Sequence, residues 1–119
     1  MARSAVWDMP EGGKVINGRR YTQHALERMA PNTPQVREEL MMRAEIIANK
    51  KGYIKGSSDY VGFIKDYVQP RNIPPMVVEG AIKSGVRTPG NKPGTFKCIT
   101  EDVKVVINSM GDVISVMAQ

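Results

Sequence analysis

The sequence has 119 residues, of which 41% are hydrophobic and 24% are charged, a balance typical of one folded domain rather than a disordered chain. Seventeen basic and twelve acidic residues give a net charge of +5, which favours an anionic partner such as nucleic acid. One cysteine and one histidine exclude an internal disulfide and a closed zinc site, and no apolar run is long enough for a membrane anchor or a signal peptide.

The N-terminal part of the chain contains a turn signal. Residues 1–13 read as a flexible lead-in because Pro10, Gly12 and Gly13 interrupt any regular pattern. The remainder, residues 14–119, reads as a single domain. Within it, the Asn-Gly pair at positions 17 and 18 predicts a two-residue hairpin over residues 14–21.

Four helices follow in the central part of the chain. Thr22 and Thr33 precede the first two as capping residues, and Asp59 is the expected cap of the third. Apolar residues recur at helical spacing in each segment, and Gly85 is the expected stop of the last helix. The expected helices cover residues 23–29, 33–51, 59–68 and 74–84.

After Gly85 the apolar period changes from that of a helix to that of a strand. Residues 86–88, 95–100, 103–108 and 112–117 are the expected strands, joined by short turns. We therefore expect an α+β fold, in which N-terminal helices pack on one face of a C-terminal antiparallel β-meander of three to five strands.

Alternation sorts the side chains of this meander into two faces. One face is apolar and should cover the helices, and in the last strand it is expected to use Ile114 and Val116 rather than Val113. The opposite face gathers polar and basic residues, namely Thr95, Lys97, Lys104, Asn108 and Ser115. Such a face is either an ordinary solvated surface or a site for an anionic ligand.

His24 is the only side chain whose usual pKa suits proton transfer near neutral pH. It lies in the first turn of the first expected helix, where the helix dipole disfavours its charged form. The chain has no glycine-rich phosphate loop of the Walker type and no acidic grouping typical of a magnesium or zinc nuclease. RNA cleavage by the RNA's own 2′-hydroxyl remains compatible with one histidine and scattered basic residues. An ordinary surface histidine is the competing interpretation.

Several segments carry a family likeness. Residues 20–29 (RYTQHALERM), residues 73–82 (IPPMVVEGAI) and the ending from Val105 to Val116 resemble the C-terminal ribonuclease toxin domains of bacterial contact-dependent growth inhibition and polymorphic toxin systems. These domains belong to the barnase, colicin D and RelE-like fold group. The resemblance implies helices followed by an antiparallel sheet whose exposed face cleaves RNA, often tRNA, without a metal ion or other cofactor.

The resemblance also implies site residues. His24 would be the general acid or base, and Ser115 stands where a threonine is expected. Arg87 would contact phosphate beside Thr88, and Thr95 would supply a hydroxyl. The resulting hypothesis groups His24, Arg87, Thr95 and Ser115 as catalytic residues around one RNA phosphate, with Thr88, Lys97, Lys104 and Asn108 binding the substrate.

Two other functions stay open from the sequence. The first is a non-catalytic nucleic-acid- or protein-binding module of a toxin-antitoxin or regulatory system, and the second is a proton-transfer enzyme acting on a small substrate. If the chain is a toxin, we expect a cognate immunity protein that is acidic where it meets the basic face. A host translation factor is a further candidate partner. We also expect delivery as part of a larger secreted or surface effector, with action in the cytoplasm of the target bacterium.

Overall fold

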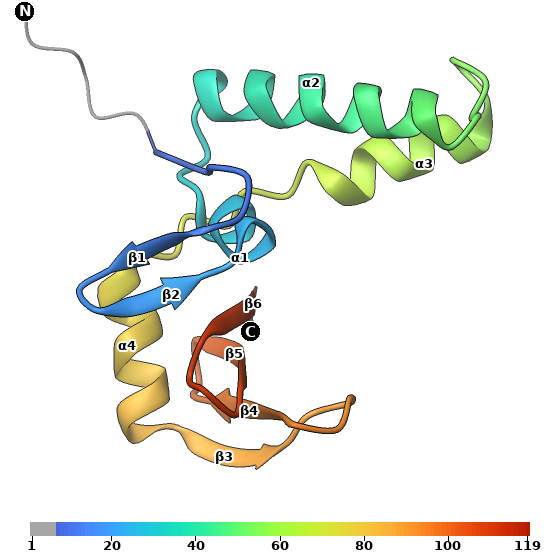
Figure 1. Ribbon diagram of the computed structural model, residues 1–119. Coiled ribbons are helices and arrows are strands. Elements are labelled where there is room, and N and C mark those ends of the chain that lie inside the picture. The colour runs from blue at the N-terminus through green and yellow to red at the C-terminus, as the bar shows by residue number, and fades with distance from the viewer. Residues whose placement is uncertain (1–6) are drawn as a thin grey trace, which may run out of the picture.

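The computed structural model describes residues 7–119, which form an α+β fold, as predicted (Figure 1). Its single sheet has six strands rather than three to five, because the N-terminal hairpin joins the C-terminal meander. The strand order is β1-β2-β6-β5-β4-β3, and all neighbours are antiparallel except β2 and β6. The strands are β1 (Lys14–Ile16), β2 (Arg19–Tyr21), β3 (Val86–Pro89), β4 (Thr95–Ile99), β5 (Val103–Asn108) and β6 (Val113–Ala118). The helices are α1 (Gln23–Met29), α2 (Pro34–Lys50), α3 (Ser58–Tyr67) and α4 (Pro75–Ser84).

The N-terminal hairpin forms at the predicted turn but does not stand alone. Asn17 and Gly18 both have positive φ angles, 50° and 82°, as a two-residue hairpin turn requires. Strands of three residues are too short to be stable by themselves. The hairpin is therefore stabilised by joining the sheet, where Tyr21 pairs with Val113 and is fully buried. The sequence analysis did not predict that contact.

The helices begin close to where the capping residues predict. Thr22 and Thr33 accept hydrogen bonds from the backbone amides of Ala25 and Val36. The prediction was wrong for the third helix, because Ser57 rather than Asp59 accepts the capping bond, from the amide of Tyr60. Asp59 instead lies in the first turn, where a carboxylate is favoured by the helix dipole.

A β-bulge corrects the predicted faces of the last strand. Val106 pairs with Ser115 and Ile107 pairs with Val113, so Ile114 is an extra residue without a partner on β5. Because of this extra residue, the side chains before and after it no longer follow one continuous alternation, and Val113 and Val116 both point into the core, where they are buried. The prediction that Val113 shares a face with Ser115 was wrong for this reason.

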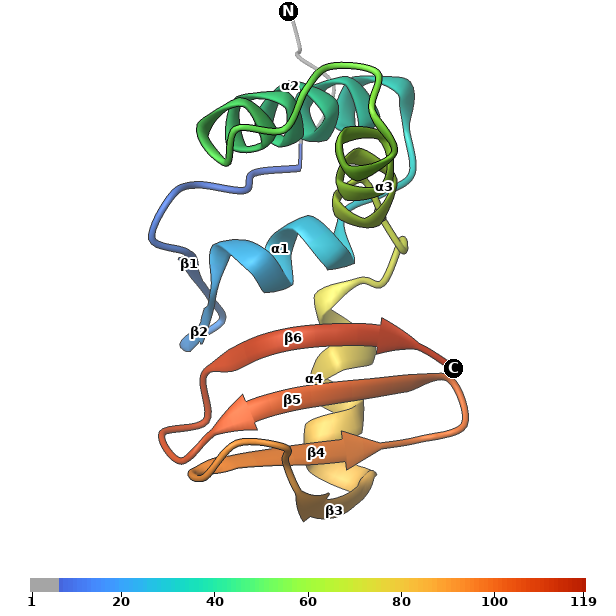
Figure 2. The same ribbon diagram turned by 90° about the vertical axis from the view of Figure 1, so that its right-hand side faces the viewer.

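Helix α4 covers one side of the sheet, and α2 and α3 form a hairpin of two helices, called here the helical arm. Helix α4 packs against β4 and β5 and lies behind the meander, whose other face has no helix over it (Figure 2). Helix α1 runs beside β6, and α2 and α3 pack on each other beyond α1. The far end of the α2–α3 hairpin extends toward the uncovered side of the sheet (Figure 1).

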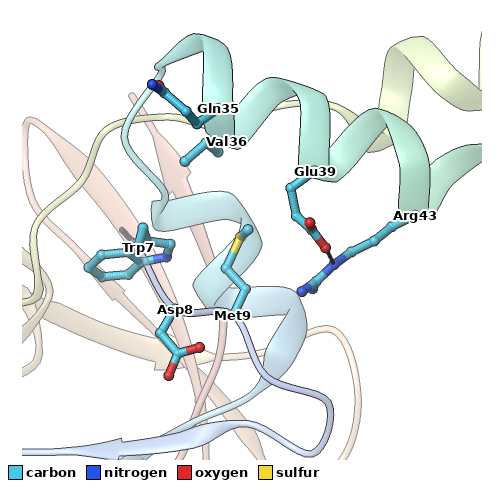
Figure 3. A pocket seen from close by; sticks show the side chains of 7 residues that line it. All are labelled: Trp7, Asp8, Met9, Gln35, Val36, Glu39 and Arg43. Carbon is cyan, nitrogen blue, oxygen red and sulfur yellow. Dashed lines mark hydrogen bonds and ion pairs between the residues drawn. The ribbon is translucent and has the colours of Figure 1, made fainter. Parts of the chain in front are cut away.

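The described part of the predicted lead-in belongs to the domain. Met9 is buried in the core, and the indole Nε1–H of Trp7 donates to the carbonyl of Leu26 at 2.7 Å. Trp7 and Met9 line a cavity of about 400 Å³ against the first turns of α2 (Figure 3). Trp7 and Met9 of the expected lead-in thus pack on the domain, and residues 1–6 lie outside the described residues. No helix between residues 7 and 119 combines the length and hydrophobicity needed to cross a membrane.

Candidate nucleic-acid interface

The uncovered side of the meander, called here the free face, carries the predicted polar residues. Thr88 pairs with Lys97, Lys97 with Val106, and Val106 with Ser115, so these four side chains form one row across the sheet. The neighbouring positions on the same face are Thr95, Ile99, Lys104, Asn108 and Met117. These strand positions include two lysines and no carboxylate, so the free face is positively charged, with apolar side chains between the polar ones.

Arg87 lies on the other side of the sheet, contrary to the expected grouping. It pairs with Cys98, whose side chain is buried in the core, so Arg87 points away from the free face. Its guanidinium carbon lies 5.9 Å from the ring centroid of Phe96. Strand β3 is also three strand spacings from β6, about 14 Å. Arg87 therefore cannot share one phosphate with Ser115.

Two other predicted residues lie on the free face but use their polar groups within the protein. The hydroxyl of Thr95 donates to the carbonyl of Lys92 at 2.6 Å in the β3–β4 loop. Asn108 accepts bonds from the amides of Met110 and Asp112 and donates to the Asp112 carboxylate at 3.1 Å. Both side chains build turns, and this local bonding leaves them poorly placed to orient a substrate.

His24 lies in the first turn of α1 with an exposed imidazole. Its pKa is lowered, first by partial desolvation of the ring and then by the positive charge of Arg28; Arg71 lowers it further, and Glu27 opposes the shift. A pKa below the usual 6.5 means that the imidazole is mainly neutral at pH 7 and can accept a proton. The direction agrees with the sequence expectation, although burial and neighbouring charges cause it.

The backbone amide of Arg71 donates to the carbonyl of Arg28 at 2.9 Å, and the charges of both arginines lower the pKa of His24. These three residues are called here the edge cluster. Arg71 is half-buried and donates from Nη1 to the carbonyl of Val116 at 2.7 Å, next to Ser115 on β6. Burial and the charge of Arg28 both lower the pKa of Arg71. Among residues 7–119, neither Arg28 nor Arg71 forms an ion pair with a carboxylate. Two neighbouring guanidinium groups without a counter-ion favour an anionic ligand.

Backbone and side-chain hydrogen bonds fix the position of α1 against β6. The amide of Thr22 donates to the carbonyl of Val113 at 3.0 Å, and its hydroxyl donates to the carbonyl of Ile114 at 3.1 Å. The start of α1 and the guanidinium of Arg71 therefore bind β6 on either side of Ser115 along the strand. This brings the edge cluster next to the β6 end of the free face.

A buried carboxylate joins α1 to the helical arm. Oε2 of Glu27 accepts hydrogen bonds from Arg43 at 2.8 Å, from the hydroxyl of Tyr67 at 2.9 Å and from Gln23 at 3.1 Å. Because Arg43 pairs with the Glu27 carboxylate, the charge of Glu27 is neutralised within the protein. Glu27 therefore holds the helix that carries His24 in a fixed orientation.

The sequence analysis missed both arginines of the edge cluster. Arg28 could have been found, because it follows His24 by four residues and so lies on the same side of α1. Arg71 could not, because it lies in an irregular segment between α3 and α4 and reaches β6 only in the folded chain.

No three His, Cys, Asp or Glu side chains within residues 7–119 lie close enough together to hold a metal ion. Comparison of the chain with protein-family models, with curated proteins and with solved structures finds no match.

Proposed function

We propose that this protein is an endoribonuclease whose reacting phosphate binds at the edge cluster, beside Ser115. The observation that carries the proposal is a pair of arginines next to a neutral histidine, neither of which pairs with a carboxylate of residues 7–119. A phosphodiester supplies the missing negative charge, and an RNA 2′-hydroxyl supplies a proton for the imidazole to accept.

The proposed reaction uses the RNA as its own nucleophile. His24 accepts the proton of the 2′-hydroxyl, the 2′-oxygen bonds to phosphorus, and the bond from phosphorus to the 5′-oxygen breaks. Water at this exposed site protonates the leaving 5′-oxygen. The products are a 2′,3′-cyclic phosphate and a 5′-hydroxyl. Arg28 and Arg71 stabilise the additional negative charge on the phosphate oxygens in the transition state.

The free face would hold the RNA on one side of the reacting phosphate. Lys104 on β5 is one strand spacing from β6 and Lys97 on β4 is two, so both can contact neighbouring phosphates. Ser115 lies nearest to the edge cluster and can donate to the reacting phosphate. Thr88, at the far end of the row, would contact RNA more distant from the reacting phosphate.

The resemblance to toxin domains supports a biological role for this activity. We propose that the protein is a toxin of contact-dependent growth inhibition or a related system and acts on RNA in the cytoplasm of a target bacterium. Its producer would then need an immunity protein with an acidic surface, which would cover the edge cluster and the free face. tRNA is the preferred candidate substrate because that fold group often cleaves it.

The first test incubates the purified protein with total bacterial RNA in the presence of EDTA. We expect discrete fragments that end in a 2′,3′-cyclic phosphate. His24→Ala should reduce cleavage by about 10²- to 10⁴-fold, the usual contribution of a general base. Fluorescence of Trp7, the only tryptophan, reports whether the variant remains folded.

A charge-matched pair of variants locates the site. Arg28→Gln and Arg87→Gln each remove one guanidinium, but only Arg28 lies in the edge cluster. We expect Arg28→Gln to lower kcat by more than tenfold, as loss of a transition-state charge donor does, and Arg87→Gln to leave kcat within about twofold. Full activity of a folded His24→Ala variant would contradict the proposal. RNA binding without cleavage by the wild-type protein would instead favour a non-catalytic binding module.

A further inference from the structure

The far end of the α2–α3 hairpin carries a second group of basic side chains. Lys50 ends α2, and Lys51 and Lys55 follow in the connection to α3. All three are exposed, no acidic residue occurs between positions 50 and 58, and none of the three forms an ion pair in the described part of the chain. These three lysines are called here the tip patch.

Aromatic packing gives the tip patch a fixed support. The ring of Phe63 packs between those of Tyr53 and Tyr67, with both centroid separations at 5.9 Å. The ammonium of Lys51 lies 5.7 Å from the Phe63 centroid. Tyr67 in turn donates to Glu27. The tip patch is thus connected through packed rings and a buried hydrogen bond to the helix that carries His24.

An apolar side chain accompanies these lysines. Ile54 lies between Lys51 and Lys55 and is 76% exposed. Exposed lysines beside an apolar side chain offer a phosphate contact and a surface for a base at the same place. One isoleucine offers too little apolar area for a stable protein partner. Three ammonium groups that pair with no carboxylate of residues 7–119 suit a polyanion instead.

The tip patch extends toward the same side as the free face. Figure 1 shows the far end of α2 and α3 projecting beyond the sheet on the side that has no helix over it. A groove of about 430 Å³ is lined by Gln23, the neighbour of His24, and by Lys50, together with Glu11, Arg43, Ile46, Ile47 and Tyr67. The groove therefore runs from the start of α1 toward the tip patch.

The length of α2 sets the size of ligand that can reach both places. Arg43 contacts α1 through Glu27, and Lys51 follows Arg43 by eight residues, about 12 Å along the helix axis. A dinucleotide at the edge cluster cannot span this distance as well. A folded RNA that lies between the free face and the helical arm can contact both the edge cluster and the tip patch.

We propose that the tip patch is a second RNA-binding surface, which makes a folded RNA of tRNA size a better substrate than a short oligonucleotide. This inference rests on the proposed ribonuclease function for its occupant. The lysines would bind backbone phosphates of the RNA at a distance from the reacting bond, and they take no part in proton transfer.

The test compares two double variants that each remove two positive charges. Lys50→Ala/Lys55→Ala changes the tip patch, whereas Lys14→Ala/Lys83→Ala changes β1 and α4, which lie on the opposite side of the molecule (Figure 1). Each is measured for binding of a tRNA transcript in a His24→Ala background, which prevents cleavage, at several salt concentrations. Cleavage of the same tRNA and of a dinucleotide is measured with His24 present.

We expect the tip variant to bind tRNA about tenfold more weakly and to reduce the slope of log K against log salt concentration by about 1 to 2. The control variant should change tRNA affinity by less than about threefold, and both variants should cleave the dinucleotide as the wild-type does. Equal tRNA affinity in the two variants would overturn the proposal. So would binding of the tip patch to poly-glutamate, used as a model acidic protein, with no response to tRNA.

The measurement of tRNA binding separates this proposal from the proposed catalytic function. If the wild-type protein cleaves no RNA, ribonuclease activity fails, yet a selective loss of tRNA affinity in the tip variant still supports the second surface. If the protein cleaves RNA but the two double variants behave alike, only the second surface fails.

Discussion

At the residue scale, the charges around His24 would determine the pH range in which the proposed ribonuclease acts. The pKa of His24 is lowered by desolvation and by Arg28 and Arg71. As the pH falls through that pKa, the imidazole of His24 is protonated and can no longer accept a proton from the RNA. We therefore expect kcat/KM for RNA cleavage to be constant near pH 7 and to decrease only below pH 6.5, the usual pKa of histidine.

The variant Arg28→Gln tests whether His24 is the group that causes this pH dependence. Removing a positive neighbour makes protonation of His24 easier, so its pKa should rise and the acidic limb of the kcat/KM profile should move to higher pH. Arg87→Gln should leave the limb unchanged, because Arg87 is not among the groups that shift His24. A limb that stays fixed in Arg28→Gln would show that another group titrates. The experiment needs only initial rates at a series of pH values.

The individual site residues were predictable to different degrees. His24, Lys97 and Ser115 follow from residue type and strand alternation, which are local properties. Arg87 was misplaced because a resemblance identifies a residue without showing which side of an edge strand it occupies. Arg71 was missed because its position depends on a contact with β6 from 45 residues away.

At the element scale, Glu27 is the main polar connection between α1 and the helical arm. Glu27→Ala would leave Arg43 and the hydroxyl of Tyr67 without their shared acceptor in a largely buried place. We expect the free energy of unfolding to fall by about 2–3 kcal/mol, the cost of an unsatisfied buried group bonded to a charge. Urea unfolding followed by Trp7 fluorescence measures this change.

Glu38→Ala is the matched control, since Glu38 is an exposed glutamate on α2. It should change stability by no more than about 0.5 kcal/mol. A similar small effect in Glu27→Ala would mean that the arm is held by apolar contacts alone. Because Glu27 also orients α1, its loss should reduce cleavage of both short and long RNA, unlike loss of the tip patch.

The elements themselves were largely predictable, and their exceptions have local causes. Caps, prolines and glycines determine where helices begin and end, so the helix bounds differ from the predictions by at most one residue. The bulge at Ile114 was not predictable, because one extra residue changes the alternation without changing composition. The union of β2 with β6 depends on a single pair distant in sequence, Tyr21 and Val113.

At the scale of the whole molecule, two separate groups of basic residues, on the sheet and on the helical arm, lie toward the same side. The free face and the tip patch lie toward the side without α4, whereas β1 and α4 lie away from it (Figures 1 and 2). Composition indicated an anionic partner, but the sequence could not show that basic residues of the sheet and of the helical arm would face the same space. That arrangement depends on how the helical arm packs on α1.

This arrangement predicts which lysines a bound RNA protects from acetylation. With tRNA bound to the His24→Ala variant, Lys97, Lys104 and the three lysines of the tip patch should become less reactive, since RNA would cover them. Lys14 and Lys83 should react as in the free protein, because they lie on β1 and α4. Mass spectrometry of the labelled peptides gives each lysine separately. Protection of Lys83 with no protection of Lys97 would place the RNA on the α4 side, and the edge cluster and the tip patch could not then bind one molecule together.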